Sequence, residues 1–475
     1  MKLNFTDESM LVNFSVTNFL SFNQKATFSM ESGRVTKKTD HLLIDQNTGK
    51  SLLNFSAMFG KNGAGKTNFI RAVSVLRNFI LTGKLPQRAP ILWCRLQDEN
   101  EANPTDFEIE FIADKKLYCY KISVVLSTGK ITNEELVSIV GNRRTKLFYK
   151  ESSESAFIFH HSIKGKNSDI EVLSRTFGMN DSPFLFSINH NTGGFFNTNP
   201  QAEPLQKAFF WFKNTLEVIF PDQPLQETSL LRYKVCKDEF SRLLKEFDTG
   251  IEEIKLEPVS KEKVFENLDL RTQQKLNLEM ILFSPFMQNK NPPLQDEQQK
   301  DASLPNEIFY STVIRNRRNI FIITSEKDNM FHFYAMKFVH NIGGKKIEFS
   351  MESESDGTHR LFQLLEILIS KKDKVYIMDE ISRSLHPKLT IQFVKKYFSN
   401  ATNRNIQLVT TTHESRIMSH DIVRRDEIWI ADTNEDDSTK LFSLEDKQVR
   451  IDKILDQNYM DNVWGGVPVF EDEEE

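Results

Sequence analysis

The sequence predicts an α/β fold in which a discontinuous domain surrounds an inserted region of antiparallel strands and helices. Residues 52–83 contain a short apolar run, a glycine-rich turn and apolar residues at helical spacing, which together form one strand–turn–helix step. Residues 346–440 again alternate helical patterns with short apolar runs. Between them, residues 105–160 alternate like antiparallel strands and residues 200–290 carry helical patterns. We assign the domain to residues 10–90 and 346–440, the insertion to residues 91–345 and a C-terminal tail to residues 441–475.

The composition indicates a protein with a large packed core. Of the 475 residues, 39 % are hydrophobic, and phenylalanine, whose burial contributes roughly 1.5–3 kcal/mol per ring, is unusually frequent. No apolar run approaches the ~18–20 residues of a membrane span, and the start MKLNFTDESM lacks the apolar segment of a signal peptide. The widely spaced Cys94, Cys119 and Cys236 argue against a disulfide framework and a cysteine-rich metal site. We expect a soluble cytoplasmic protein without a membrane partner.

The charge balance argues against a protein that binds nucleic acid through an overall basic surface. The formal net charge is -5, from 61 basic and 66 acidic residues. Two local basic clusters leave a nucleic-acid partner open, although such clusters are more often solvated strand ends and loops; they are Arg143, Arg144 and Lys146, and Arg315, Arg317 and Arg318. The acidic run 471–475 is more typical of a solvated tail than of a partner-binding one.

The strongest motif is a phosphate-binding loop. Its pattern, G-x-x-x-x-G-K-[ST], is fitted by Gly60, Lys61, Asn62, Gly63, Ala64, Gly65, Lys66 and Thr67. Glycines allow successive backbone N–H groups to turn toward a phosphate, and the following helix directs the positive end of its dipole at the anion. Lys66 can reach the terminal phosphates, and the Thr67 hydroxyl can ligate Mg²⁺. A buried strand before the loop and an amphipathic helix after it distinguish the motif from an ordinary glycine-rich turn.

Polar residues also follow two later apolar runs. Asp379 and Glu380 come directly after the apolar residues 375–378, at the strand end where α/β sheets bind ligands. Asp379 is expected to hold Mg²⁺, and Glu380 to orient or deprotonate an attacking water. His413 follows the next strand, at a place where it can hydrogen-bond a terminal phosphate; the alternative is a surface or helix-capping histidine.

A further anion site is suggested by Ser355 and Gly357 in the run SDGT, just before a leucine-rich helical pattern. Taken alone, this run is more often a helix cap. Because one phosphate-binding loop already serves this chain, a second anion site suggests that Ser355 and Gly357 act on the nucleotide of another subunit.

The order of these motifs resembles that of ABC-type ATPases, particularly the SMC/RecF-like branch, and residues 379–387 (DEISRSLHP) are similar to its Walker B and D-loop segment. Several stretches resemble AAA-family ATPases of bacterial anti-phage and abortive-infection systems, namely the RloA and AbiL-type proteins, with the PARIS and Septu ATPase subunits as relatives. These stretches are LVNFSVTNFLSF (11–22), ESDGTHRLF (354–362), TTHE (411–414), DEIWI (426–430) and WGGVP (464–468).

The resemblance implies an enzyme that binds ATP and Mg²⁺ and forms a dimer or higher homo-oligomer with nucleotide between subunits. Glu380, His413 and Lys66 would then be catalytic, Thr67 and Asp379 would hold the metal, and Ser355 and Gly357 would contact the partner's γ-phosphate. Gln97 is a candidate for the Q-loop glutamine.

The resemblance further implies a sensor or regulator that acts with a separately encoded effector, which we expect to be a nuclease. Only residues 431–475 follow the last predicted strand, too few for a nuclease domain of ~100 residues. His160, His161 and His190 do not form a nuclease-like cluster in the sequence. Three alternatives are a RecF-like DNA-repair ATPase, the ATPase of a transporter, and a scaffold that is gated by slow nucleotide hydrolysis.

Overall fold

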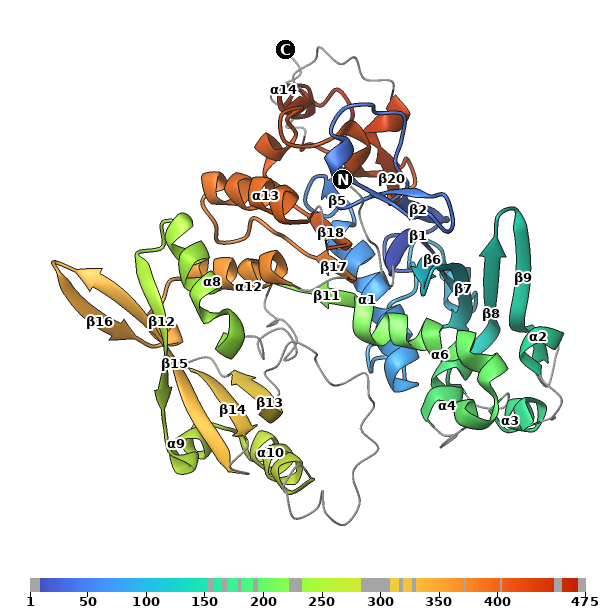
Figure 1. Ribbon diagram of the computed structural model, residues 1–475. Helices are drawn as coiled ribbons and strands as arrows, with labels where there is room; N and C mark the ends of the chain where they lie inside the picture. Colours follow the sequence, from blue (N-terminus) through green and yellow to red (C-terminus); the bar gives the residue numbers. More distant parts are fainter. Residues whose placement is uncertain are drawn as a thin grey trace. The chain divides into compact units, whose positions relative to one another are not determined.

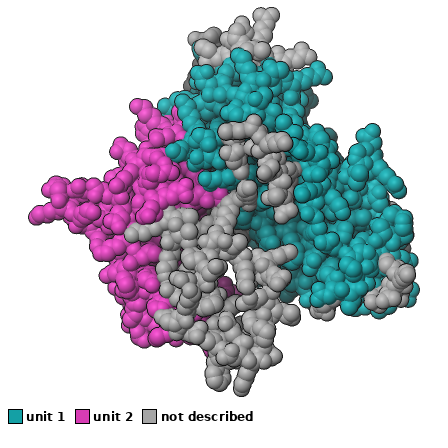
Figure 2. All heavy atoms as spheres, in the orientation of Figure 1, with its two compact units in different colours: residues 1–221, 371–382, 394–475 teal, residues 222–370, 383–393 magenta. Residues whose placement is uncertain are grey.

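The computed structural model describes residues 9–151, 157–164, 169–177, 181–190, 195–221, 233–282, 308–315, 319–326, 330–370, 373–401, 404–447 and 455–468. The chain forms two compact units, which are teal and magenta in Figure 2. Unit 1 comprises residues 1–221, 371–382 and 394–475, and unit 2 comprises residues 222–370 and 383–393.

A six-stranded sheet forms the centre of unit 1 (Figure 1). Its neighbouring strands run parallel except for the last pair, in the order β11 (Leu216–Ile219), β17 (Lys374–Met378), β18 (Ile406–Thr411), β5 (Phe55–Phe59), β19 (Ile428–Thr433) and β20 (Thr439–Ser443). Every residue of β5 and β18 is buried, as in parallel sheets covered on both faces. The sheet therefore joins three parts of the sequence that lie far apart, namely residues 55–59, 216–219 and 374–443.

Unit 1 also contains a seven-stranded antiparallel sheet. In spatial order its strands are β10 (Ile158–Phe159), β9 (Arg143–Glu151), β8 (Lys130–Val140), β7 (Lys116–Val125), β6 (Thr105–Ala113), β1 (Met10–Thr17) and β2 (Ala26–Ser29). Over most of its length, β6 alternates buried and half-buried residues, so one face packs and the other meets solvent. The antiparallel strands predicted over residues 105–160 are confirmed. A separate hairpin is formed by β3 (Leu42–Ile44) and β4 (Ser51–Leu53).

Helix α1 (Lys66–Thr82) belongs to a hydrophobic core that is shared by the two sheets. Phe69 of α1 packs with its ring centroid 5.5 Å from that of Phe14 on β1 and 5.2 Å from that of Phe28 on β2. Phe28 in turn lies 4.8 Å from Trp429 on β19, measured between ring centroids. Aromatic residues thus connect the antiparallel sheet, α1 and the parallel sheet, which accounts for part of the high phenylalanine content.

Short helices complete unit 1. Those after the antiparallel sheet are α2 (His161–Lys164), α3 (Asp169–Phe177), α4 (Phe184–His190), α5 (Phe195–Thr198) and α6 (Glu203–Phe210), and α14 (Leu455–Met460) lies near the C-terminus. Glu134 of β8 is buried and accepts hydrogen bonds from Tyr120 Oη at 2.9 Å and from the first backbone N–H of α4, that of Phe184, at 2.8 Å. Burial raises the pKa of Glu134 to about 7.

Unit 2 contains a third sheet and its own core. The antiparallel strands are β12 (Ile251–Pro258), β15 (Phe331–Ile342), β14 (Ile320–Glu326) and β13 (Ile308–Arg315), and β16 (Lys345–Phe349) also pairs with β15. Its helices are α8 (Tyr233–Glu246), α9 (Lys261–Glu266), α10 (Leu270–Leu282) and α12 (Asp356–Ile369). The ring of Phe362 on α12 lies 5.5 Å from that of Phe240 on α8 and 5.6 Å from that of Phe338 on β15. Helix α13 (Pro387–Ala401) includes residues of both units.

The predicted α/β fold with an antiparallel and helical insertion is confirmed, but the compact units divide the chain differently from the predicted segments. Residues 91–221 belong to unit 1, although the sequence places them with the insertion. The reason is strand pairing, because β6 lies beside β1 from Asp106 to Ile112 and extends the sheet that β1 begins. Among the described residues, no helix combines the length and apolar character that crossing a membrane requires.

Truncation of Phe69 is expected to destabilise unit 1. Its side chain is 1 % exposed, and replacing a buried phenylalanine with alanine costs roughly 3–5 kcal/mol. We expect Phe69→Ala to unfold at a clearly lower urea concentration, measured by intrinsic fluorescence. Asn78→Ala, an exposed change on the same helix, is the control and should leave the midpoint almost unchanged. Equal midpoints for the two variants would contradict this account of the core.

Candidate functional site

The predicted phosphate-binding loop connects β5 to α1, the two elements that the motif requires. Lys66, the first residue of α1, is buried, and its side chain folds back over the loop. Its Nζ donates to the carbonyl oxygens of Gly60 at 2.6 Å and Lys61 at 3.0 Å. The loop therefore holds the lysine ammonium group in a polar cradle of its own backbone.

Burial also changes the acidity of this lysine. It lowers the pKa of Lys66 to about 8, although the nearby carboxylates of Asp379 and Glu380 act in the opposite direction. A cation with a lowered pKa in a partly desolvated site gains more from an anionic ligand than an exposed lysine would.

Hydrogen bonds from side chains of other segments hold the phosphate-binding loop in place. Thr439 of β20 donates to the Ala64 carbonyl at 3.0 Å and hydrogen-bonds Ser21 Oγ at 2.7 Å, which also accepts from Asn68 Nδ2 at 2.9 Å. Gly65 has a φ of +97°, and a β-carbon there would lie 2.2 Å from Thr439 Oγ1. Glycine is needed at this position both for the backbone conformation and for the close approach.

Asp379 lies at the carboxyl end of β17 and is 3 % exposed. Its Oδ1 accepts hydrogen bonds from Thr411 Oγ1 at 2.6 Å and from Thr67 Oγ1 at 3.3 Å. The carboxylate predicted to hold a metal is thus beside the hydroxyl predicted to do the same, because β17 and α1 both reach this edge of the sheet.

Glu380, the next residue, has a left-handed backbone conformation with a φ of +50°. Such a conformation is uncommon for a residue other than glycine and costs on the order of 1 kcal/mol or more. Its backbone N–H donates to Thr411 Oγ1 at 2.8 Å, and the N–H of Ile381 donates to the Thr411 carbonyl at 3.0 Å. Thr411 therefore holds the bend that turns the half-buried Glu380 away from the strand.

His413 follows β18 and has an exposed side chain. Partial desolvation and the nearby Lys66 ammonium group lower the pKa of His413, while Glu380 and Asp379 act to raise it. The imidazole is therefore neutral at pH 7, able to donate from one ring nitrogen and accept at the other.

The residues present fit a magnesium ion. Thr67 Oγ1 and Asp379 Oδ1 are 3.3 Å apart, close to the roughly 3 Å that separates adjacent oxygen ligands of an octahedral Mg²⁺ ion. A hydroxyl and one carboxylate leave most coordination positions to water and phosphate oxygens, the pattern that this ion favours.

The remaining predicted residues, Ser355 and Gly357, belong to unit 2. Ser355 is exposed and caps α12, because its Oγ accepts a hydrogen bond from the Thr358 backbone N–H at 3.0 Å. A β-carbon on Gly357 would lie 2.8 Å from the Ser384 carbonyl oxygen, so this glycine allows residues 384 and 357 to approach closely. Capping, the simpler interpretation from the sequence, is a role that Ser355 has in the structure.

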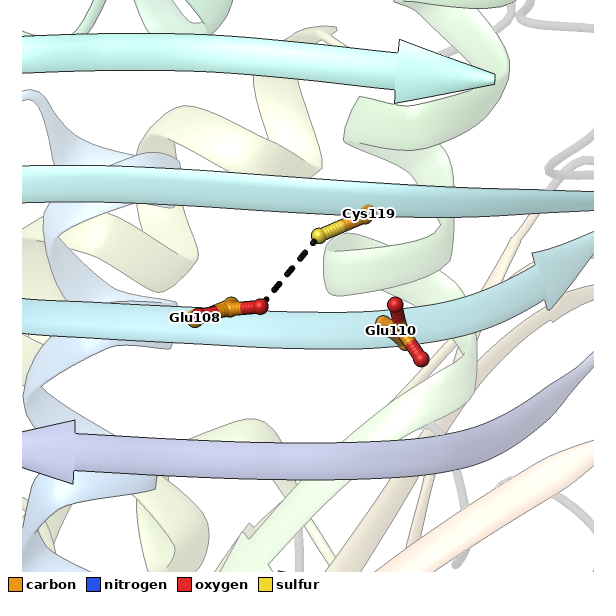
Figure 3. A group of neighbouring side chains, drawn as sticks. All are labelled: Glu108, Glu110 and Cys119. Carbon is orange, nitrogen blue, oxygen red and sulfur yellow. Dashed lines mark hydrogen bonds between the residues drawn. The ribbon is translucent and has the colours of Figure 1, made fainter. Parts of the chain in front are cut away.

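A second group of potential metal ligands lies on the antiparallel sheet, where Glu108 and Glu110 of β6 are neighbours of Cys119 on β7 (Figure 3). Each carboxylate has a cationic partner, since Lys25 Nζ lies 2.7 Å from Glu108 Oε2 and Arg144 Nη2 lies 3.2 Å from Glu110 Oε1. Burial raises the pKa of Cys119 to about 12, so its sulfur remains a thiol. We therefore assign no metal to this group.

The basic cluster on β9 is largely neutralised. Arg144 pairs with Glu110, and Lys146 Nζ lies 2.8 Å from Glu135 Oε2. Arg317 and Arg318, the side chains of Arg315 and Cys236, and the acidic run 471–475 lie outside the described residues.

Three other histidines from the sequence analysis and the Q-loop candidate lie far in the sequence from the loop 60–67, Asp379 and His413. His160 hydrogen-bonds Ser162 Oγ at 2.8 Å, and the ring of His190 stacks on that of Phe186 with centroids 4.2 Å apart. His161 begins α2. Gln97 is exposed and precedes a single helical turn in the loop before β6.

The sequence does not indicate several of the supporting residues. Thr411 lies within the run TTHE and Ser21 within the run ending FLSF, but a single sequence does not indicate which hydroxyl reaches another segment. Thr439 and Asn68 stand in no recognisable motif. Tyr459, near the run WGGVP, packs on Phe59, the residue before the loop, with ring centroids 5.9 Å apart.

Comparisons with known proteins show similarity to an AAA domain. Residues 229–419 match the family model described as "AAA domain, putative AbiEii toxin, Type IV TA system", over less than half of the chain. No curated protein matches the sequence. Among solved structures, the chain is similar to an SMC head bound to the C-terminal winged-helix domain of ScpA, at 12 % identity and a TM-score of 0.37, over 91 % of this chain and 97 % of that one. It is also similar to the SMC head domain of Thermotoga maritima, at 11 % identity and a TM-score of 0.31, over 91 % and 98 % of the two chains. The chain thus carries a region similar to an AAA ATPase domain, which includes Asp379, Glu380 and His413.

Proposed function

We propose that the protein is a magnesium-dependent ATPase that works as a dimer or higher homo-oligomer and regulates a separately encoded effector. The observation that carries the enzymatic part is the meeting of the loop 60–67, Asp379 and Glu380 at one edge of the parallel sheet. Thr67 and Asp379 are hydrogen-bonded, and the charges of Asp379 and Glu380 act on Lys66.

The residues suggest how ATP would be bound and hydrolysed. The loop N–H groups and Lys66 bind the phosphates. Two of the three ammonium N–H donors are held by the carbonyls of Gly60 and Lys61, which leaves the third to donate to a phosphate oxygen. Bound Mg²⁺, held by Thr67 and Asp379, would neutralise charge on the phosphates. Glu380 accepts a proton from the attacking water, and the neutral imidazole of His413 hydrogen-bonds the terminal phosphate.

The proposed dimer rests on the position of Ser355 in a helix cap. The hydroxyl is exposed and lies at the N-terminus of the 14-residue helix α12, where the backbone favours an anion. With a single phosphate-binding loop in the chain, we propose that the anion is the γ-phosphate bound by a second copy.

Similarity to a family model supports the proposed biological role. The matched family is described as a putative AbiEii toxin of a type IV toxin–antitoxin system, and we propose a role in anti-phage defence like that of the RloA and AbiL-type proteins, with a nuclease as effector. The alternative of a RecF-like DNA-repair ATPase is less favoured, because Arg144 and Lys146 are paired with carboxylates rather than free to bind a phosphate backbone.

The first test concerns Glu380. We expect Glu380→Gln to bind ATP but to lose roughly 10²–10⁴-fold in kcat, the usual contribution of a positioned general base, and to accumulate as an ATP-bound dimer. Phosphate release and mass photometry measure both effects, with the exposed Glu101→Gln as a matched control. Turnover at the wild-type rate would show that Glu380 is not the catalytic carboxylate.

The second test uses the acidity of Lys66. Since the pKa of free Lys66 is lowered to about 8, the charged form that binds phosphate predominates at pH 7 and is the minor form at pH 9. Binding of a non-hydrolysable ATP analogue should weaken by up to about tenfold over that range. Lys66→Arg stays charged, so its weaker binding should show no such decline; a parallel decline in both proteins would assign the effect to another group.

The third test separates the two halves of a shared site. Ser355→Asp keeps a side chain that caps α12 but places a negative charge beside the phosphate, so it should abolish turnover while retaining ATP binding. Ser355→Asn caps without charge and is the control. Mixing Ser355→Asp with Lys66→Ala should restore activity, because a mixed dimer contains one intact loop facing one intact Ser355. Absence of any recovery in a mixture that forms dimers would exclude a site built from two subunits.

A further inference from the structure

The C-terminal segment 455–468 packs against the first residue of the phosphate-binding loop. Tyr459 of α14 is buried, and its ring lies 5.9 Å from that of Phe59, the last residue of β5, measured between centroids. The Tyr459 hydroxyl donates a hydrogen bond to the Gly466 carbonyl oxygen at 2.9 Å. Burial raises the pKa of Tyr459 to about 12, so the hydroxyl keeps its proton.

Gly60 connects this segment to the lysine of the loop. Its carbonyl accepts the hydrogen bond from Lys66 Nζ at 2.6 Å. Gly466, whose carbonyl is bound by Tyr459, lies beside Gly60, so contacts run from Tyr459 through Gly466 and Gly60 to Lys66.

The double glycine of the run WGGVP allows this approach. Gly466 has a φ of +82°, and a β-carbon there would lie 2.9 Å from Ile430 Cγ2 and 3.5 Å from Gly60 Cα. Any larger residue at position 466 would push the segment away from both β19 and the loop.

We propose that Tyr459 is a positioning residue for the nucleotide site, because it holds Gly466 against Gly60 and so restrains the Gly60 backbone and the Lys66 side chain. Segment 455–468 is then an integral part of this site. The inference rests on the proposed ATPase function and adds a structural determinant to it. Without the hydroxyl, the Gly466 carbonyl loses this partner, and the segment that packs beside Gly60 can shift together with the backbone that orients Lys66.

The experiment removes only the oxygen atom. We expect Tyr459→Phe to weaken binding of a non-hydrolysable ATP analogue by roughly three- to tenfold, the effect of one lost hydrogen bond, and to raise KM more than it lowers kcat. Tyr397→Phe is the matched control, since the Tyr397 hydroxyl is also buried and donates to the carbonyls of Asn54 at 2.8 Å and Ile406 at 2.9 Å, away from the loop. This control should lower stability and leave affinity unchanged.

A second measurement does not depend on nucleotide. Amide hydrogen exchange in a peptide spanning residues 60–67 should be faster in Tyr459→Phe than in the wild type, and unchanged in Tyr397→Phe. Wild-type affinity and wild-type exchange in Tyr459→Phe would overturn the proposal, as would an equal loss of affinity in both variants. If the wild type binds no ATP while Tyr459→Phe still accelerates exchange, the proposed function fails and the positioning of the loop stands.

Discussion

The burial of one ammonium group organises the site of this protein. Lys66 is charged, nearly inaccessible to solvent and held by carbonyl oxygens of its own loop. A buried cation requires such partners, and the surrounding structure supplies them. Gly60 must present its carbonyl, Asp379 and Glu380 must lie close enough to favour the charge, and the elements that carry them must meet at one edge of the sheet. The close packing below the loop, by Ser21 and Thr439, keeps that arrangement in place.

Much of this arrangement could be predicted from the sequence, because local patterns determine it. An apolar run followed by glycines and a helical pattern gives β5, the loop and α1, and an apolar run ending in two acids gives β17 with Asp379 and Glu380 at its tip. Parallel strands expose their carboxyl ends at one edge, so the meeting of these residues follows from the topology.

What could not be predicted depends on pairing between distant segments. The pattern of residues 105–160 indicates antiparallel strands but does not reveal that β6 lies beside β1. The hydrogen bonds of the Thr411 and Tyr459 hydroxyl groups could not be predicted either, because the sequences around these residues do not indicate their partners. For Ser355 the local sequence is informative but ambiguous, because a serine that caps a helix and a serine that binds an anion stand in the same local sequence.

The discontinuous parallel sheet also determines the order in which the protein can assemble during synthesis. Strand β5 ends at Phe59, yet its two neighbours begin at Ile406 and Ile428. At 5–20 residues per second, roughly 20–70 s pass between the emergence of β5 and that of its first partner. A nascent chain therefore carries the predicted phosphate-binding loop beside a strand with two unpaired apolar edges, a candidate for chaperone binding. Products that stop before β18 and β19 lack both neighbours of β5, so the edge of the sheet that carries the loop, Asp379 and Glu380 is completed only after residue 433 has been synthesised.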